Sequence, residues 1–150
     1  MDASATTPKP SGIPPHWDVE VDGIRWLPRM IEKARMRLRG TLGAYLMGHS
    51  PVDKALLKRL GIGTEDFVRI VSENPDDAAV LAALRARGFD EASVRGWSAS
   101  FPQRYATYIT LWDLDEGYTR AQLWQAPFIS VFHSIERPVM AAFRKVVGAP

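Results

Sequence analysis

Apolar residues recur at helical spacing along most of the chain, and this pattern predicts an all-α fold. The stretch that organises the pattern covers residues 27–40, in which Pro28 suits the first turn of a helix and Gly40 its end. One side of this stretch is apolar and consists of Leu27, Met30, Ile31, Ala34 and Leu38. We expect the rest of the domain to pack around this helix.

The middle of the chain carries the start and stop signals of four further short helices. The predicted starts and ends, in chain order, are Ser50-Pro51 with Asp53, Gly61, Thr64, Asn74-Pro75-Asp76-Asp77, Gly88 and Asp90. Little strand-like alternation lies between these segments. With the C-terminal third included, the pattern indicates a compact bundle of about six to eight short helices.

The segment before the first helix has a different composition. Residues 1–16 are rich in Ser, Thr and Pro, which predicts a disordered tail. Asp22-Gly23 is a turn signal and makes a hairpin conceivable. Pro28 leaves little room for a second strand, however, so we expect an extended lead-in instead. A single helical domain over residues 17–150 follows.

Aromatic residues concentrate in the last third of the chain. One helical stripe consists of Phe101, Tyr105, Tyr108 and Trp112, and a second extends from Phe128 to Val146. The two stripes predict an antiparallel helical pair whose rings are core residues rather than a base-stacking platform. No recognised nucleic-acid motif is present, so a nucleic-acid partner is disfavoured. The apolar surface of this pair leaves room for a second copy, and homodimerisation is a compatible hypothesis.

Composition excludes several classes of protein. The chain has no cysteine, which removes disulfide scaffolds, thiol catalysis and Cys-ligated metals. No apolar run approaches the roughly 20 residues that span a bilayer, and a signal-peptide pattern is missing. We therefore expect a cytoplasmic protein without membrane association. His133 and Glu136 have the H-x-x-E spacing of half a bundle metal site, but the other ligands are not readable, so no metal or cofactor is expected.

Positive charge is concentrated in the organising helix. Arg25, Arg29, Lys33 and Arg37 follow each other at four-residue steps, flanked by Arg35 and Arg39, and Glu32 is the one acid among them. The whole chain carries a net charge of only +2. Like charges four residues apart destabilise a helix, so this face is either a solvated surface or a surface that binds an anionic partner.

Three motifs carry a resemblance to a known family. They are LPRMIEKAR from Leu27, SPVDKALLKRLGI from Ser50 and GWSASF from Gly96. In these motifs the chain resembles the bacterial family known as domain of unknown function 5069, over residues 22–101, with 102–150 as a C-terminal helical extension. The resemblance implies a small helical cytoplasmic protein and brings no established activity. The matching positions are Leu27, Pro28, Arg29, Lys33, Ala34, Arg35, Pro51, Asp53, Leu57, Gly61 and Trp97.

The candidate ligand-binding residues are Arg29, Lys33, Arg35, Tyr45, His49 and Trp97. Arginine and lysine beside a tyrosine and a histidine provide donors for a phosphate or a carboxylate. No nucleophile with an oriented base is readable, so no catalytic residue is assigned. The leading hypothesis is a non-enzymatic module whose basic helix docks an anionic ligand or an acidic protein surface. The alternative is a small enzyme or small-molecule-binding protein with a pocket between the aromatic C-terminal helices and Tyr45/His49.

Overall fold

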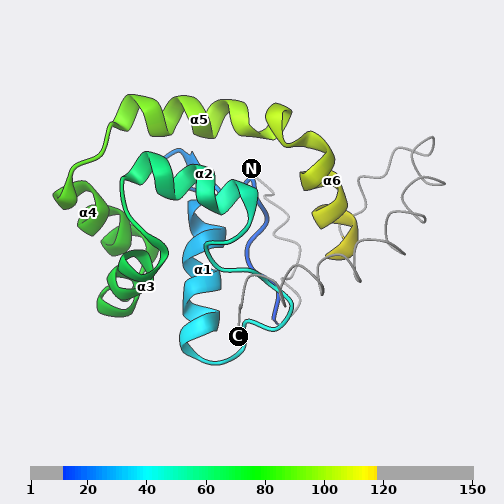
Figure 1. Cartoon of the computed structure of the whole chain (residues 1–150), viewed down its shortest axis with the longest axis horizontal. Coiled ribbons are helices and arrows are strands. Elements are labelled where there is room, and N and C mark those ends of the chain that lie inside the picture. Colours follow the sequence, from blue (N-terminus) through cyan, green and yellow to red (C-terminus); the bar gives the residue numbers. More distant parts are fainter. Residues whose placement is uncertain (1–11, 118–150) are drawn as a thin grey trace, which may run out of the picture.

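The computed structural model describes residues 12–117, which form six α-helices and one two-stranded hairpin (Figure 1). The elements are β1 (Glu20–Val21), β2 (Ile24–Arg25), α1 (Leu27–Leu38), α2 (Pro51–Leu60), α3 (Thr64–Glu73), α4 (Asp77–Arg87), α5 (Glu91–Arg104) and α6 (Ala106–Asp115). The predicted mostly helical fold is confirmed. The predicted tail up to residue 11, the second aromatic stripe and the proposed dimer surface lie outside the described residues.

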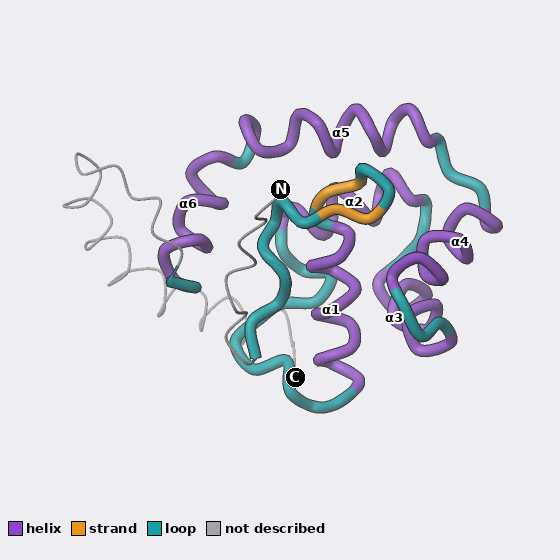
Figure 2. Tube along the Cα trace, turned by 180° about the vertical axis from the view of Figure 1, so that it is seen from behind, coloured by secondary structure: helices purple, strands orange, loops and turns teal. Residues whose placement is uncertain are grey.

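Helix α1 lies in the middle of the domain. Helices α3 and α4 pack together on one side of α1, and α5 extends across one end with α2 next to it (Figure 1). Helix α6 follows α5 at the opposite end from α4, and the β1–β2 hairpin lies close to α1 and α5 (Figure 2). Every other element is therefore arranged around α1, as the sequence pattern indicated.

The core is built largely from the apolar side of α1. Leu27, Met30, Ile31 and Ala34 are completely buried, as predicted. Leu38, assigned to the same stripe, is 52% exposed because α1 ends there. Met36 is buried although it stands among the basic residues.

A side chain caps the start of α2, α4 and α5. Ser50 accepts a hydrogen bond from the backbone N–H of Asp53, and Asp90 accepts one from that of Ser93. Two predicted starts are displaced. Thr64 is itself helical with Gly63 before it, and the cap of α4 is Asp76 rather than Asn74. Such shifts are small because neighbouring polar residues compete for the same cap position.

The segment before α1 forms a hairpin, so the expected extended lead-in is wrong. Glu20 pairs with Arg25, and Val21 pairs with Ile24. The turn residues Asp22 and Gly23 have φ values of 46° and 76°, which suit a two-residue hairpin turn. The turn also contacts two helices, because Asp22 forms ion pairs with Arg85 of α4 (2.6 Å) and with Arg95 of α5 (3.3 Å).

The aromatic stripe of the C-terminal third starts on one helix and continues on the next. Pro102 lies in the last turn of α5, and the chain bends at Tyr105 before α6 begins. Phe101 is buried in the core, and Tyr105 and Tyr108 pack against it in part. The interpretation of these three rings as core residues is therefore confirmed.

The N-terminal segment is attached to α6 by a histidine. His16 is buried, and its Nε2 donates a hydrogen bond to Asp113 Oδ1 (2.8 Å), while its Nδ1 contacts Asp18. Trp17 donates from Nε1 to the other oxygen of Asp113 (3.2 Å). The predicted disordered tail therefore ends too late, because His16 belongs to the folded domain. The sequence gives no hint of a partner nearly a hundred residues away.

This attachment predicts a pH-dependent stability. Burial by itself lowers the pKa of His16, but the hydrogen bonds and charges of Asp113 and Asp18 outweigh burial and raise it. A pKa above the unfolded value of about 6.5 means that protonated His16 stabilises the fold at low pH, and that this stability is lost as pH rises through the folded-state pKa. We expect the melting temperature of the wild type, relative to His16→Gln, to fall over that range. His49→Gln is the control and should keep the wild-type dependence of melting temperature on pH. If both variants lose that dependence equally, His16 is not its source.

Candidate functional site

The two central cations of α1 point into the domain. Arg29 and Lys33 are each only 3% exposed. Arg29 donates from Nη1 to Glu116 Oε2 (3.0 Å) and from Nη2 to Glu116 Oε1, which is a bidentate pair. Lys33 donates from Nζ to Asp53 Oδ2 (2.6 Å) and to the carbonyl of Leu46 (3.0 Å). The prediction that both residues lie on an exposed basic face is therefore wrong.

The other cations of α1 are neutralised nearer the surface. Arg35 pairs with Asp77 of α4 (2.8 Å), and Arg37 pairs with Glu65 of α3 (2.9 Å). Arg39 reaches back to Glu32 on the same helix (2.8 Å). The positive excess along α1 is thus balanced by carboxylates from its own and neighbouring helices. The hypothesis that α1 docks an anionic partner assumed that these cations are unpaired, and that assumption is wrong.

Asp53 is the centre of the buried network. Its carboxylate has no exposure and accepts from Lys33 Nζ, from Trp26 Nε1 (2.8 Å) and from the backbone N–H of Gly48 (2.9 Å). Sequence reasoning assigned Asp53 only to the start of α2, where its own N–H indeed donates to Ser50 Oγ (3.1 Å). Three donors from three different segments fix this carboxylate in place.

Aromatic rings enclose the two cations. The Arg29 guanidinium carbon lies 5.3 Å from the centroid of Trp26 and 5.7 Å from those of Tyr45 and Trp112. Lys33 Nζ lies 5.5 Å from the Trp26 ring. Tyr45 and Trp112 stack on each other at 5.8 Å with an interplanar angle of 19°. Cations at these distances are attracted by the ring faces, most strongly where water is excluded.

Trp26 holds a strained backbone conformation at this site. Its φ of 68° is in the left-handed region, which a bulky residue rarely adopts. It precedes α1, and its side chain makes no capping hydrogen bond. The strain persists because the indole is fixed by Asp53 and by an edge contact with Phe101 (5.9 Å). Strained residues of this kind cluster at functional sites.

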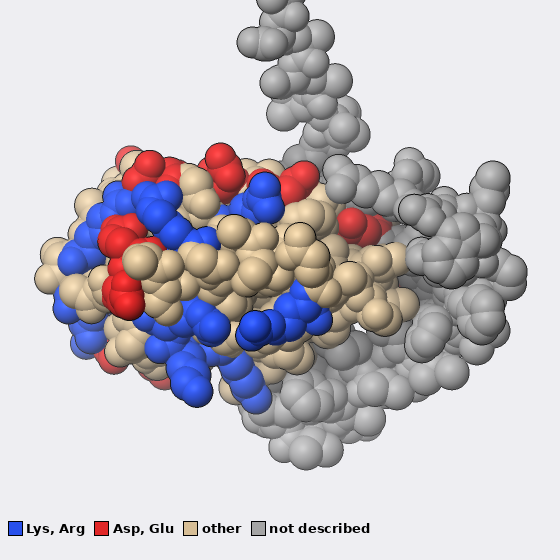
Figure 3. Space-filling view, turned by 90° about the horizontal axis from the view of Figure 1, so that it is seen from above, with Lys and Arg blue, Asp and Glu red and all other residues tan. Residues whose placement is uncertain are grey.

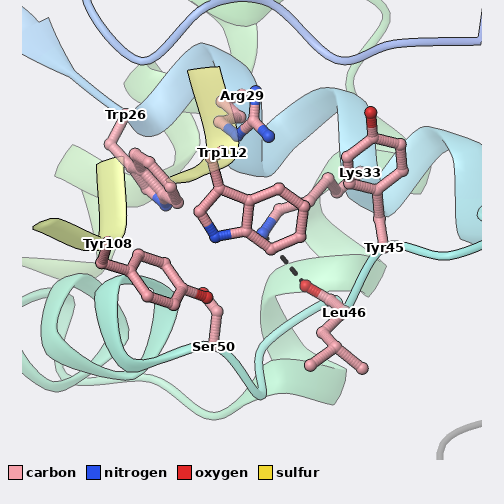
Figure 4. A pocket seen from close by; sticks show the side chains of 8 residues that line it. All are labelled: Trp26, Arg29, Lys33, Tyr45, Leu46, Ser50, Tyr108 and Trp112. Atoms are coloured by element: carbon pink, nitrogen blue, oxygen red, sulfur yellow. Dashed lines mark hydrogen bonds between the residues drawn. The ribbon is translucent and has the colours of Figure 1, made fainter. Parts of the chain in front are cut away.

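A small cavity lies between these side chains (Figure 4). It is lined by Trp26, Arg29, Lys33, Tyr45, Leu46, Ser50, Tyr108 and Trp112. The space open to the centre of a water molecule is about 10 Å³, which suits about one water. Its place, between Tyr45 and α6, corresponds to the pocket of the alternative hypothesis, but His49 is not among its lining residues.

Two buried polar atoms lie at this cavity, Arg29 Nε and the hydroxyl of Tyr108. Arg29 Nε has no hydrogen-bond partner in the described part of the protein, whereas the Tyr108 hydroxyl interacts with the side chains of Ser50 and Trp112. Burial raises the pKa of Tyr108 to about 12, so its hydroxyl keeps its proton at neutral pH. Burial also lowers the pKa of Lys33, an effect that Asp53 opposes. Buried donors are normally satisfied, so Arg29 Nε still lacks an acceptor among the described residues.

The remaining predicted site residues lie elsewhere. Arg35 faces Asp77 on α4, away from the cavity lining. Trp97 is buried and stacks on Phe101, with 4.7 Å between the ring centroids. The guanidinium carbon of Arg59 lies 6.0 Å from the centroid of the Trp97 ring. Of the six candidates, the structure brings Arg29, Lys33 and Tyr45 together. Sequence reasoning did not assign Trp26, Ser50, Asp53, Tyr108, Trp112 or Glu116 to this site, although Tyr108 and Trp112 belong to the stripe proposed as a pocket wall.

Two further classes of feature are missing from the described part of the chain. Among residues 12–117, no group of three or more His, Asp or Glu side chains is arranged to hold a metal ion. Within the same range, no helix has both the length and the apolar character that crossing a bilayer requires. The predicted half-site at His133 and Glu136 lies outside these residues.

Comparison with known proteins gives one positive result. No curated protein matches the chain. A family model matches residues 15–118, which extends the resemblance beyond the three sequence motifs to include His16, Asp113 and Glu116. Because this match covers more than half of the sequence, the chain belongs to the family described as Domain of unknown function (DUF5069).

Proposed function

We propose that this protein is a non-enzymatic binding module that takes a small anionic group, a carboxylate or a phosphate, in the Arg29 pocket. The Arg29 pocket is the cavity between Trp26, Arg29, Tyr45, Tyr108 and Trp112. One observation carries the proposal: the Arg29 Nε donor is buried at this cavity without an acceptor among the described residues. An anion would supply an acceptor oxygen to it.

The chemistry of the pocket suits an anion. A guanidinium offers a planar fork of donors that matches carboxylate and phosphate oxygens. Exclusion of water strengthens each charge-assisted hydrogen bond. Lys33 adds a second positive charge to the lining, and the aromatic faces hold both cations in place. Tyr108, protonated at neutral pH, contributes a neutral donor.

Glu116 sets the affinity of this pocket. Its carboxylate already occupies the two terminal nitrogens of Arg29. Because the cavity has room for about one water, a ligand must displace this carboxylate to reach the guanidinium. An intramolecular competitor has a high effective concentration, so binding to the wild type is expected to be weak.

Catalysis is not part of the proposal, because the pocket lacks the groups that it needs. Ser50 is the one serine among the described lining residues, and its hydroxyl oxygen caps α2 by accepting a hydrogen bond from the backbone N–H of Asp53. None of the lining residues is a histidine or a carboxylate, and the one amine among them, Lys33, is engaged by Asp53 and by the Leu46 carbonyl. The described lining therefore favours binding over reaction.

The test replaces the guanidinium by an amine that keeps the charge. Arg29→Lys retains a cation opposite Glu116 but loses Nε and the fork. With acetate or inorganic phosphate as the probe, we expect a saturable change in tryptophan fluorescence in the wild type, since Trp26 and Trp112 line the pocket. We expect binding to weaken at least about tenfold in Arg29→Lys, the equivalent of about 1.4 kcal/mol.

Arg35→Lys is the matched control. It makes the same change on the same helix, at a cation that pairs with Asp77 outside the pocket. Binding should be unchanged in this variant. The proposal fails if the wild type shows no saturable response to either anion, or if both variants lose it equally.

A further inference from the structure

A second cationic region lies outside the Arg29 pocket, on the side of α2 that faces solvent. Lys54 and Lys58 are exposed and one turn apart, and Arg59 lies beside them. Arg104, near the end of α5, is also exposed. Among the residues that the structure describes, none of these four cations has a carboxylate within ion-pair distance. Every cation from Arg29 to Arg39, on α1 and directly after it, has one.

Three of the four cations lie on α2, and Arg104 lies on α5, which packs against α2. Arg59 lies over Trp97 of α5 at 6.0 Å, and Ser50, just before α2, lines the same cavity as Tyr108 of α6. These two contacts place α2 antiparallel to the α5–α6 segment. Arg104, between Trp97 and Tyr108 in the chain, therefore comes level with the part of α2 that carries Lys54 and Lys58. We call this surface the α2/α5 face. The exposed α5 residues beside it are small or uncharged: Gly96, Ala99, Ser100 and Gln103.

The α2/α5 face is almost free of acids. From residue 50 to 64 the only carboxylate is Asp53, which is buried and paired with Lys33, and residues 92–112 contain none. In Figure 3, basic side chains gather along the lower edge of the described surface, whereas basic and acidic ones are intermixed along the upper edge and at the left. The sequence outside residues 12–117 contains only two acids, Asp2 and Glu136.

From this charge pattern we propose that the α2/α5 face is a docking surface for an acidic segment of a partner protein. The cations are carried by two packed helices, and Arg59 lies over the Trp97 ring. An acidic segment would therefore meet charges that are already in place. Charge complementarity of this kind mainly accelerates and orients association. The surface is separate from the Arg29 pocket, and neither proposal depends on the other.

Two other anionic partners fit the face less well. Nucleic-acid binding commonly uses about 6–10 phosphate contacts and exposed rings for single-stranded bases. Trp97, the ring beneath Arg59, is buried and offers no such platform. An anionic membrane surface would favour apolar side chains among the cations. The exposed large hydrophobic residues of the described chain, Val19 and Leu38, lie outside α2 and α5.

The experiment measures binding of a fluorescently labelled polyglutamate peptide by anisotropy, at low and at high salt. We expect binding by the wild type that weakens with salt. Removing two contacts in Lys54→Gln/Lys58→Gln should weaken it about tenfold, as expected for two exposed charge pairs near 0.7 kcal/mol each. A short DNA duplex and phosphatidylserine vesicles are titrated in parallel.

The matched control is Arg69→Gln/Arg87→Gln. It removes the same number of charges from exposed positions of α3 and α4, where both cations pair with Asp66. Polyglutamate binding should be retained in this variant. Equal loss of binding in the two double variants would show a general charge effect and overturn the proposal. The proposal is also overturned if the wild type does not bind polyglutamate, or if it binds the duplex or the vesicles more tightly than polyglutamate.

Discussion

Replacing Asp53 by alanine is expected to lower the free energy of unfolding by about 3–5 kcal/mol, the usual cost of removing one partner of a buried ion pair. The change leaves the Lys33 ammonium without its carboxylate in a site that is only 3% exposed. It also removes the acceptor of Trp26 Nε1 and of the Gly48 N–H. A domain of this size is stable by only about 5–15 kcal/mol, so urea unfolding should show a large decrease in midpoint.

A control with the same chemistry on the surface separates burial from pairing. Asp66 accepts from Arg69 at 2.6 Å, the same distance as in the Lys33–Asp53 pair, but both side chains are about half exposed. Asp66→Ala should cost no more than about 1 kcal/mol. Asp53→Asn, which keeps an acceptor but not the charge, should lie between the two. Equal costs for Asp53→Ala and Asp66→Ala would mean that the buried network is not formed.

Local chemistry made much of the fold predictable. Helix starts at Ser50 and Asp90 and the glycine end at Gly61 depend on hydrogen bonds and φ angles within a few residues. The inward side of α1 follows from apolar spacing alone, except at its end, where Leu38 is exposed because the helix stops. These features need no knowledge of the rest of the chain.

The candidate site was predictable only in part, because its geometry depends on distant partners. Four-residue spacing correctly placed Arg29 and Lys33 on one face of α1, but a sequence cannot show which element covers that face. Glu116 and Asp53, which neutralise these cations, are 87 and 20 residues away in the chain. A run of basic residues therefore resembles a docking surface until the positions of the acids are known.

The distribution of ion pairs changes where a partner is expected. Cations that looked available on α1 are occupied, whereas those of α2, which attracted no attention in the sequence, have no carboxylate within the described residues. Paired charges stabilise or position, and unpaired exposed charges are available to attract. The same reasoning makes Glu116 the most informative residue of the Arg29 pocket, because it fills the place that an external anion would take.

Glu116→Ala should convert the Arg29 pocket from an occupied into an open site. Loss of the carboxylate leaves a buried guanidinium whose remaining acceptor in the described structure is the Pro15 carbonyl (3.0 Å). In chloride buffer we expect a loss of about 3–5 kcal/mol of stability. Acetate at a hundred times its dissociation constant should restore about 2.7 kcal/mol, by binding to the folded state alone. Melting temperatures in chloride and acetate at equal ionic strength measure both effects.

Glu65→Ala distinguishes binding of acetate from a general salt effect. Glu65 also pairs with an arginine, Arg37, at 2.9 Å, but its side chain is 79% exposed, so its loss leaves no enclosed site to refill. Acetate should therefore stabilise Glu116→Ala well above both the wild type and Glu65→Ala. If the gain in acetate is the same in all three proteins, Arg29 does not offer an anion site even when it is vacated. Weak binding of acetate to the wild type could then not be explained by competition from Glu116. The proposed function, anion binding in the Arg29 pocket, would also be wrong.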